Sequence, residues 1–457
     1  MPGAGAAYRP ASAALTRLDL SRQAWEGNLT IGETFIVSFS RPGANAPLRT
    51  PLFAPFQVRS FRFQYPADLL TSWGGEMENL ILGWYILVQT GSVLLLTVFA
   101  SLQYFGTLVA PLLGLAGDRV GHRNVLCAMR AVYATLAAIV ATLAFAGWLS
   151  PAKVFVIAAT AGLVRPSDLA MRGALVAETI PSERLIGAMG ASRTTADSAR
   201  IAGPLAGAGL FAAFGMGPAY LGIALVYVTG LLLTLGTGAA RRFADTAPRF
   251  TFWRELREGL AYVWGAPAAL AALLLAFLVN MTAFPLTSGL LPYVAREIYH
   301  IDQTGLGTLV ASFATGALIG SVTISIAGRA IRPARMMLVF AVVWYAMLLV
   351  FVHVPDARHG RAVLLLAGLA QSLSLVPMSA MLLQGAGERF RGRVMGLRML
   401  AIYGLPLGLL TAGALINRLG FPAATTLLCS TGLLLTLAIA MRWRADLWPR
   451  EAPANMR

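Results

Sequence analysis

The chain has 457 residues, of which 57% are hydrophobic and only 12% are charged. Soluble globular proteins carry about 25% charged residues, so the composition argues against a soluble protein and predicts an integral membrane protein. The net charge of +16 does not indicate nucleic-acid binding, because cytoplasmic loops of membrane proteins collect Arg and Lys for topological reasons.

The N-terminal segment, residues 1–57, has no sustained apolar run of the kind that opens a signal peptide. We predict a disordered cytoplasmic tail here. The two cysteines, Cys127 and Cys429, lie in separate apolar runs and have no metal-ligand spacing. We therefore expect no metal site and no cofactor.

A membrane span needs roughly 20 apolar residues. Runs of this kind lie near residues 66–88, 91–116, 124–149, 152–173, 186–214, 217–238, 266–292, 303–327, 333–354, 361–386, 392–416 and 421–441. They predict an all-α membrane protein with twelve transmembrane helices.

The basic residues predict the orientation of these spans. Of 36 Lys and Arg residues, only five fall in the loops of one side, namely Lys153, Arg296, Arg358, Arg361 and Arg418. The positive-inside rule therefore places both termini in the cytoplasm. The long inner connection, 239–265, contains an amphipathic stretch and divides the spans into bundles over 58–238 and 266–441, followed by a tail over 442–457.

Span one carries two carboxylates, Glu76 and Glu78, and the amide Asn79. Ionisable groups inside a span are costly and mark functional sites. Desolvation disfavours the charged form of a carboxylate, which could then exchange a proton near neutral pH. The two glutamates lie about 200° apart around a helix, so only one can face a given cavity. The alternative is that one or both pair structurally with an Arg of span four or five.

The loop between spans two and three contains Gly114, Asp118, Arg119, Gly121 and Arg123 in the order Gly-Leu-Ala-Gly-Asp-Arg-Val-Gly-His-Arg. This pattern resembles the loop signature of the major facilitator superfamily. The resemblance implies a fold of two six-helix bundles, and it implies that Asp118, Arg119 and Arg123 act as a latch at an inner gate. A purely topological role is the alternative for the two arginines.

Spans four and five each carry an Arg–Asp–Arg ladder, made of Arg165, Asp168 and Arg172 and of Arg193, Asp197 and Arg200. Spacings of three and four residues place each Asp beside its two Arg on one helix face. We expect mutual neutralisation for Arg172 and Arg193. Arg165 and Arg200 lie deeper and are candidates for contacting an anionic substrate or relaying protons.

Span five continues through Gly203, Pro204 and Gly207, and span eleven opens with the sequence Arg-Gly-Arg-Val-Met-Gly at 391–396. The span-five sequence partly resembles the signature of drug–proton exporters. Its proline should kink the helix, and its glycines would let another helix approach closely. Simple packing is an equal alternative. Taken together, these stretches resemble the bacterial branch of enterobactin (siderophore) exporters and macrolide-efflux proteins.

The resemblance implies a bacterial inner-membrane exporter of a small amphipathic compound, monomeric and driven by proton antiport. The expected partners are the substrate, the lipid bilayer and protons, without nucleic acid. Alternatives are an uncoupled lipid or metabolite carrier of the same fold, or a membrane sensor or assembly protein. No catalytic motif lies outside the apolar runs, so we do not expect an enzyme.

Overall fold

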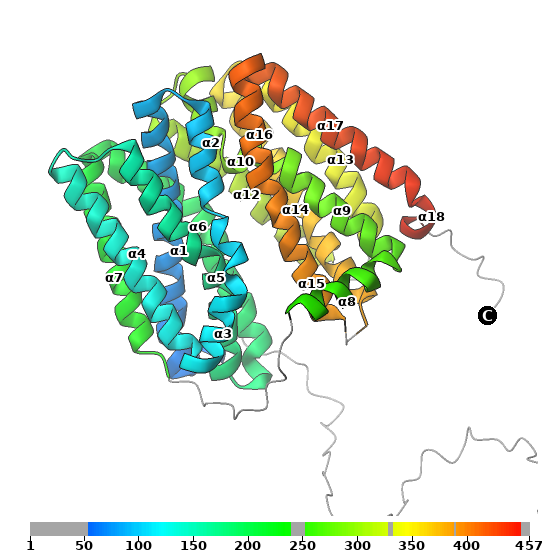
Figure 1. Ribbon diagram of the computed structural model, residues 1–457, viewed down its shortest axis with the longest axis horizontal. Helices are drawn as coiled ribbons and strands as arrows, with labels where there is room; N and C mark the ends of the chain where they lie inside the picture. The colour runs from blue at the N-terminus through cyan, green and yellow to red at the C-terminus, as the bar shows by residue number, and fades with distance from the viewer. Residues whose placement is uncertain (1–53, 239–251, 328–331, 388–389, 449–457) are drawn as a thin grey trace, which may run out of the picture. The chain divides into compact units, whose positions relative to one another are not determined.

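The computed structural model describes residues 54–238, 252–327, 332–387 and 390–448. Of the predicted tail over 1–57, residues 1–53 lie outside the described residues, whereas Ala54–Gln57 form a short 3-10 helix. Residues 239–251 of the predicted connection over 239–265 and the last nine residues, 449–457, also lie outside the described residues. Within the described ranges every regular element is helical. Helices occupy all twelve positions at which the sequence predicts a span (Figure 1).

The first bundle contains the helices that correspond to spans one to six. Their bounds are η1 Ala54–Gln57, α1 Arg59–Thr90, α2 Val93–Leu102, η2 Phe105–Leu108, α3 Ala110–Val120, α4 His122–Phe145, α5 Pro151–Thr179, α6 Ser182–Phe214 and α7 Met216–Leu235.

The second bundle begins after helix α8, Phe252–Trp264. Its elements are α9 Pro267–Thr282, α10 Phe284–Ser288, α11 Leu291–Tyr293, η3 Val294–Ile298, α12 Gln303–Ala327, α13 Pro333–Val352, α14 Ala357–Gly385, α15 Arg391–Leu400, η5 Ala401–Tyr403, α16 Gly404–Leu419, α17 Phe421–Arg442 and α18 Arg444–Leu447.

Several spans differ from the continuous helices that the sequence predicts. Span two is divided into α2, η2 and α3, and span seven into α9, α10, α11 and η3. Pro285 and Pro292 lie at the starts of α10 and α11, where a proline without an N–H interrupts the helix ladder. Span one begins seven residues earlier than predicted, at Arg59.

Hydropathy separates the spans into two kinds. Eight helices of the described chain are long and apolar enough to cross a membrane on their own. The helices α1 and α6 are not among them because they carry several charged residues. A purely apolar criterion thus misses α1 and α6 because of their charge, and it misses span two because its helices are short, while the charged helix α5 still meets it.

The contacts between the two bundles lie near the end where α1 meets α2. Gly83 of α1 faces Pro292, and Arg296 donates a hydrogen bond to the backbone oxygen of Leu87 at 2.6 Å. Further down the same half, Ser101 of α2 donates to Pro406 O of α16 at 3.3 Å. Figure 1 shows α2 beside α16 in this region. The bundles are therefore joined at the end opposite the α3–α4 turn.

Helix α8 is attached to the second bundle. Its Glu258 forms an ion pair with Arg393 of α15 at 3.0 Å, and Tyr262 donates a hydrogen bond to Gly385 O of α14 at 2.8 Å. The Tyr262 ring stacks on Phe390 with a centroid distance of 4.5 Å. These contacts fix α8 to the ends of α14 and α15.

Candidate functional site

A cavity of about 440 Å³ lies in the first bundle, with walls from α1, α5 and α6 and one tyrosine each from α4 and α7. It extends along α1 from Asn79 to Asp68 and along α6 from Arg200 to Met189. It thus runs from mid-bundle toward the end where α5 joins α6. The predicted residues on its wall are Glu76, Asn79, Arg165, Asp168, Arg172, Arg193 and Arg200.

The two glutamates of α1 lie in different environments, as their angular separation requires. Glu76 is half-buried and lines the cavity. Within the part of the chain that the structure describes, it makes no hydrogen bond and no ion pair. Glu78 is only 3% exposed and lies behind the cavity wall. Of the two, only Glu76 is available to a ligand in the cavity.

Glu78 is held by side chains from α5 and α7. Arg165 donates to Glu78 Oε2 at 2.6 Å, and Tyr227 OH donates to the same oxygen at 3.1 Å. Arg165 also donates to Gln103 Oε1 at 3.1 Å and to Asn79 Oδ1 at 3.5 Å. The structural pairing that the sequence left open is the arrangement observed for Glu78.

A second ion-pair cluster contains residues to which the sequence analysis assigned no role. Asp68 of α1 is 1% exposed and pairs with Arg130 of α4, which is completely buried. Arg172 of α5 pairs with Asp168 and lies 3.7 Å from Asp68. It also donates to Ser72 Oγ at 2.6 Å. This cluster ties three helices together around buried charge.

The presence of Asp68 and Arg130 inside predicted spans was the available signal for this cluster. The sequence could not show that Asp68 and Arg130 pair with each other, because they are 62 positions apart. Arg130 makes a further hydrogen bond to Thr234 of α7, which extends the cluster to a fourth helix.

Each predicted Arg–Asp–Arg ladder has one ion pair instead of two. In α5 Asp168 pairs with Arg172, while Arg165 turns to Glu78. In α6 Arg193 Nε lies 3.6 Å from Asp197 Oδ1. Arg200 lines the cavity, is exposed to it, and has no ion-pair partner among the described residues. In α5 a partner on a neighbouring helix thus overrides the intrahelical spacing, whereas in α6 the third member of the ladder faces the cavity.

The glycines of α6 lie where α1 approaches most closely. A Cβ at Gly203 would lie 2.7 Å from Glu76 Cβ, and one at Gly207 would lie 2.8 Å from Met77 Cα. The helix continues through Pro204 without interruption. Close packing against α1 is therefore the observed contribution of Gly203 and Gly207, and it places α6 directly beside Glu76.

The α3–α4 turn contains the signature residues. Gly121 joins the two helices with a φ of 96°, a conformation that favours glycine. Arg123 donates to the backbone oxygen of Leu235 at the end of α7. Asp118 is exposed and lies 3.7 Å from His122 Nε2. Gly114 and Arg119 lie on α3 within the same segment. The latch role of these residues stays a prediction.

His122 also belongs to this turn, although the sequence analysis gave it no role. Its Nδ1 lies 2.6 Å from Glu178 Oε1 near the end of α5. A Cβ at Gly117 would approach the His122 ring to 2.9 Å. The imidazole thus fills the corner between α3, α4 and α5.

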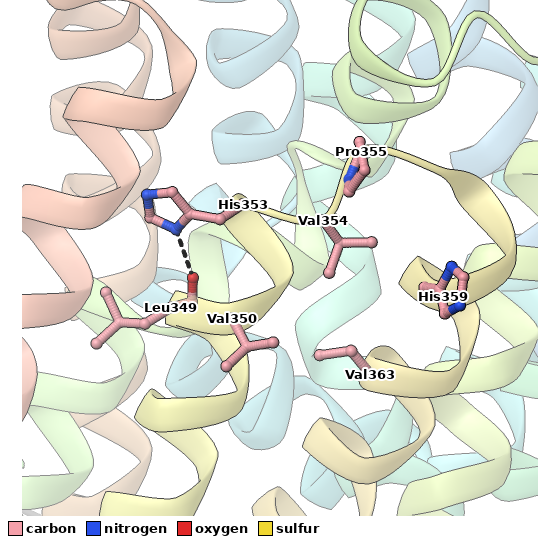
Figure 2. Close-up of a pocket in the computed structure, with 7 residues that line it drawn as sticks. All are labelled: Leu349, Val350, His353, Val354, Pro355, His359 and Val363. Atoms are coloured by element: carbon pink, nitrogen blue, oxygen red, sulfur yellow. Dashed lines mark hydrogen bonds between the residues drawn. The ribbon is translucent and has the colours of Figure 1, made fainter.

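A second hollow, of about 670 Å³, lies at the α13–α14 turn and contains none of the predicted residues (Figure 2). His353 Nδ1 donates to Leu349 O at 2.9 Å beside its apolar wall. Asp356 caps α14 outside the span. Backbone and side-chain hydrogen bonds from His359 hold the pKa of the Asp356 carboxyl below its ordinary value. The hollow lacks the opposed charges of the first cavity.

Across the described ranges, no cluster of three or more His, Cys, Asp or Glu has metal-ligand geometry. The cavity in the first bundle has instead charged side chains, tyrosines and apolar side chains on its wall. This arrangement can bind a small charged organic molecule by complementary ion pairs.

The sequence matches the family model described as Major Facilitator Superfamily over residues 68–405, with a second match over 273–456. No curated protein matches the sequence. Similar solved structures include the nucleoside transporter NupG, with a TM-score of 0.66 and 13% identity over 86% of this chain and 100% of that chain.

Two further structures have the same fold. A bacterial homologue of the human lysosomal transporter Spinster, in an inward-facing and unoccupied conformation, has a TM-score of 0.68 and 12% identity over 89% of this chain and 100% of that chain. A D-xylose–proton symporter has a TM-score of 0.65 and 11% identity over 83% and 96%. Identities this low establish a common fold and leave the substrate open.

Proposed function

The chain belongs to the major facilitator superfamily, a family of membrane transporters and not of enzymes, and on that premise we propose that it exports a small amphipathic compound by alternating access. The site is the cavity of the first bundle, and the energy comes from proton antiport. The protein is a multi-pass membrane protein.

The observation that carries the proposal is the free carboxylate of Glu76. The other carboxylates that line the cavity or pair with its lining residues, Asp68, Glu78, Asp168 and Asp197, each pair with an arginine. Glu76 faces the cavity without such a partner among the described residues. A single carboxylate that can hold either a proton or a cationic substrate group couples their movements, because the two compete.

The direction of transport and the orientation of the protein in the membrane are inferred from the sequence. The excess of basic residues on one side supports an orientation with both termini in the cytoplasm, and the resemblance to bacterial exporters supports a bacterial inner membrane protein. The contacts between bundles then close the outer end, and the cavity extends toward the cytoplasm. The stretches that resemble siderophore and macrolide exporters support export. The bundles over 58–238 and 266–441, the linker over 239–265 and the tails at 1–57 and 442–457 are the corresponding domains.

The proposal is tested in proteoliposomes that contain a pH-sensitive dye and carry an imposed pH gradient. We expect that at least one of tryptophan, tryptophanamide and ethidium, which each carry a cationic group, will release protons down the gradient through the wild-type protein, whereas the anion N-acetyltryptophan will not. Glu76→Gln should abolish this coupling, whereas Glu183→Gln, on the exposed first turn of α6, should not. Equal proton movement in wild type and Glu76→Gln would contradict the assignment of Glu76. Compound movement without any proton movement would indicate an uncoupled carrier.

A further inference from the structure

Ten charged side chains of the first bundle line the cavity or pair with a residue that lines it. There are five acids and five bases, Asp68, Glu76, Glu78, Asp168 and Asp197 against Arg130, Arg165, Arg172, Arg193 and Arg200. Four of the acids and four of the bases form ion pairs. One acid, Glu76, and one base, Arg200, are left without an ion-pair partner among the described residues.

Both remaining charges line the same cavity. Glu76 lies on α1 against Gly203, where a Cβ would come within 2.7 Å of Glu76 Cβ. Arg200 is three residues before Gly203 on α6, about one helical turn away. The two side chains are therefore neighbours across the α1–α6 contact, yet no ion pair joins them. Each is free to bind a ligand group of opposite charge.

The α6 side of the cavity carries positive charge. Arg193 and Arg200 both line this wall, and among the described residues Arg193 has one ion-pair partner, Asp197, at 3.6 Å. An acidic ligand group beside α6 would therefore lie near two arginines. No second free carboxylate faces the cavity among its described lining residues to offset this charge.

The rest of the cavity wall is suited to an apolar body. Leu169, Met189, Tyr133 and Tyr227 lie on the wall beside the charged residues. A volume of about 440 Å³ is in the usual range of small-molecule sites, roughly 300–1,000 Å³. Such a site would take one compact molecule with a polar end and an apolar end.

We propose that the substrate is an amphipathic zwitterion, whose cationic group binds Glu76 and whose acidic group binds Arg200. This inference rests on the proposed function and identifies the class of its substrate. It also explains antiport, because a proton on Glu76 removes the charge that holds the cationic group. The Glu76 carboxylate would then hold either the substrate or a proton, and release of the substrate would accompany uptake of the proton.

The test is a binding measurement on the purified full-length protein in detergent. It uses four ligands that share the tryptophan skeleton and differ in charge. Tryptophan is the zwitterion, N-acetyltryptophan the anion, tryptophanamide the cation and N-acetyltryptophanamide the neutral form. By calorimetry, tryptophan should bind at least about tenfold more tightly than each of the others, since each lost charge leaves a protein charge unpaired. No tryptophan binding, or equal binding of a singly charged analogue, would overturn the inference.

Two variants assign the charges to their partners. In Glu76→Gln, tryptophan and N-acetyltryptophan should bind equally, because the amine no longer has a partner. In Arg200→Gln, tryptophan and tryptophanamide should bind equally. Glu183→Gln and Arg59→Gln, which remove exposed charges away from the cavity, should keep both preferences. A preference that survives in both cavity variants would overturn the assignment, and the wild-type series decides the ligand class even if a variant does not fold.

The binding measurement tests the ligand class, and the transport measurement tests the proposed function, so the two proposals can fail separately. Zwitterion preference without proton-coupled flux would contradict the proposed function and leave the ligand class standing. Proton-coupled flux of a singly charged compound, without zwitterion preference in binding, would support the transporter and contradict the ligand class.

Discussion

The charges within the first bundle fall into two groups with different physical roles. Arg130 and Asp68 are almost completely buried and paired. Removing a charge from water is expensive, and a partner offsets that cost only while both members remain. Glu76 and Arg200 instead face a cavity, where water or a ligand can solvate them. Stability should therefore depend on the first pair, and binding on the second.

Replacing Asp68 should reveal the cost of burying Arg130 alone. We expect Asp68→Ala to lower the free energy of unfolding by about 3–5 kcal/mol, measured by reversible denaturation in mixed detergent micelles. Asp197→Ala removes the partner of Arg193, a largely exposed side chain, and should cost about 0–1 kcal/mol.

A double variant tests whether the loss of stability in Asp68→Ala comes from leaving Arg130 buried without a partner. Asp68→Leu combined with Arg130→Met removes both charges and should recover much of the stability lost in Asp68→Ala. Equal destabilisation by Asp68→Ala and Asp197→Ala would contradict the claim that burial of the Asp68–Arg130 pair determines the size of the loss.

The sequence predicts some of these ion pairs and not others. The spacing within α5 and α6 predicted intrahelical ladders, and it identified Arg193–Asp197 and Asp168–Arg172 as pairs. It could not predict that Arg165 leaves Asp168 for Glu78, because that choice depends on how α1 packs against α5. Asp68 had the same intramembrane signal as Glu76, but its partner became identifiable only from the fold.

At the scale of elements, the contact between α1 and α6 positions the site. Gly203 and Gly207 allow α6 to reach the backbone of α1 beside Glu76 and Met77. Small residues at helix interfaces have this function in membranes, where packing replaces the hydrophobic effect as the driving force. The twelve helical positions could be predicted from apolar runs, and Pro285 and Pro292 were the available sequence signal for the break in span seven.

A matched pair of glycines tests this contact. Gly207→Ala would place a Cβ 2.8 Å from Met77 Cα, a backbone atom that cannot move aside easily, and should destabilise the protein by about 1–3 kcal/mol. A Cβ at Gly209, one helix residue beyond Ala208, would meet no atom within 4 Å.

Gly209→Ala should therefore be neutral or stabilising by up to about 1 kcal/mol through helix propensity. Both are measured as shifts of the thermal unfolding midpoint in detergent. Destabilisation of the same size in both variants would show that the α1–α6 contact is not close enough to exclude a methyl group.

At the scale of the whole described body, the two bundles meet at one end and the cavity extends toward the other. Contacts of α1 with α11 and η3, and of α2 with α16, close the end opposite the α3–α4 turn. The helix α8 is attached to the second bundle through Glu258 and Tyr262. It should therefore move with that bundle. An alternating-access transporter must exchange this arrangement for its opposite.

Distance measurements between spin labels at both ends test this central requirement most directly. One pair is Val120→Cys with Arg391→Cys, at the ends of α3 and α15, and the other is Phe214→Cys with Leu419→Cys, at the ends of α6 and α16. All four positions are exposed. Both pairs are made in a background without Cys127 and Cys429.

We predict that a change from alkaline to acidic buffer, or addition of tryptophan, shifts the two distance distributions in opposite directions, one end closing as the other opens. Glu76→Gln should remove the response to pH while both distributions remain those of a folded protein. Distances that stay unchanged, or that change in the same direction at both ends, would contradict alternating access through this cavity.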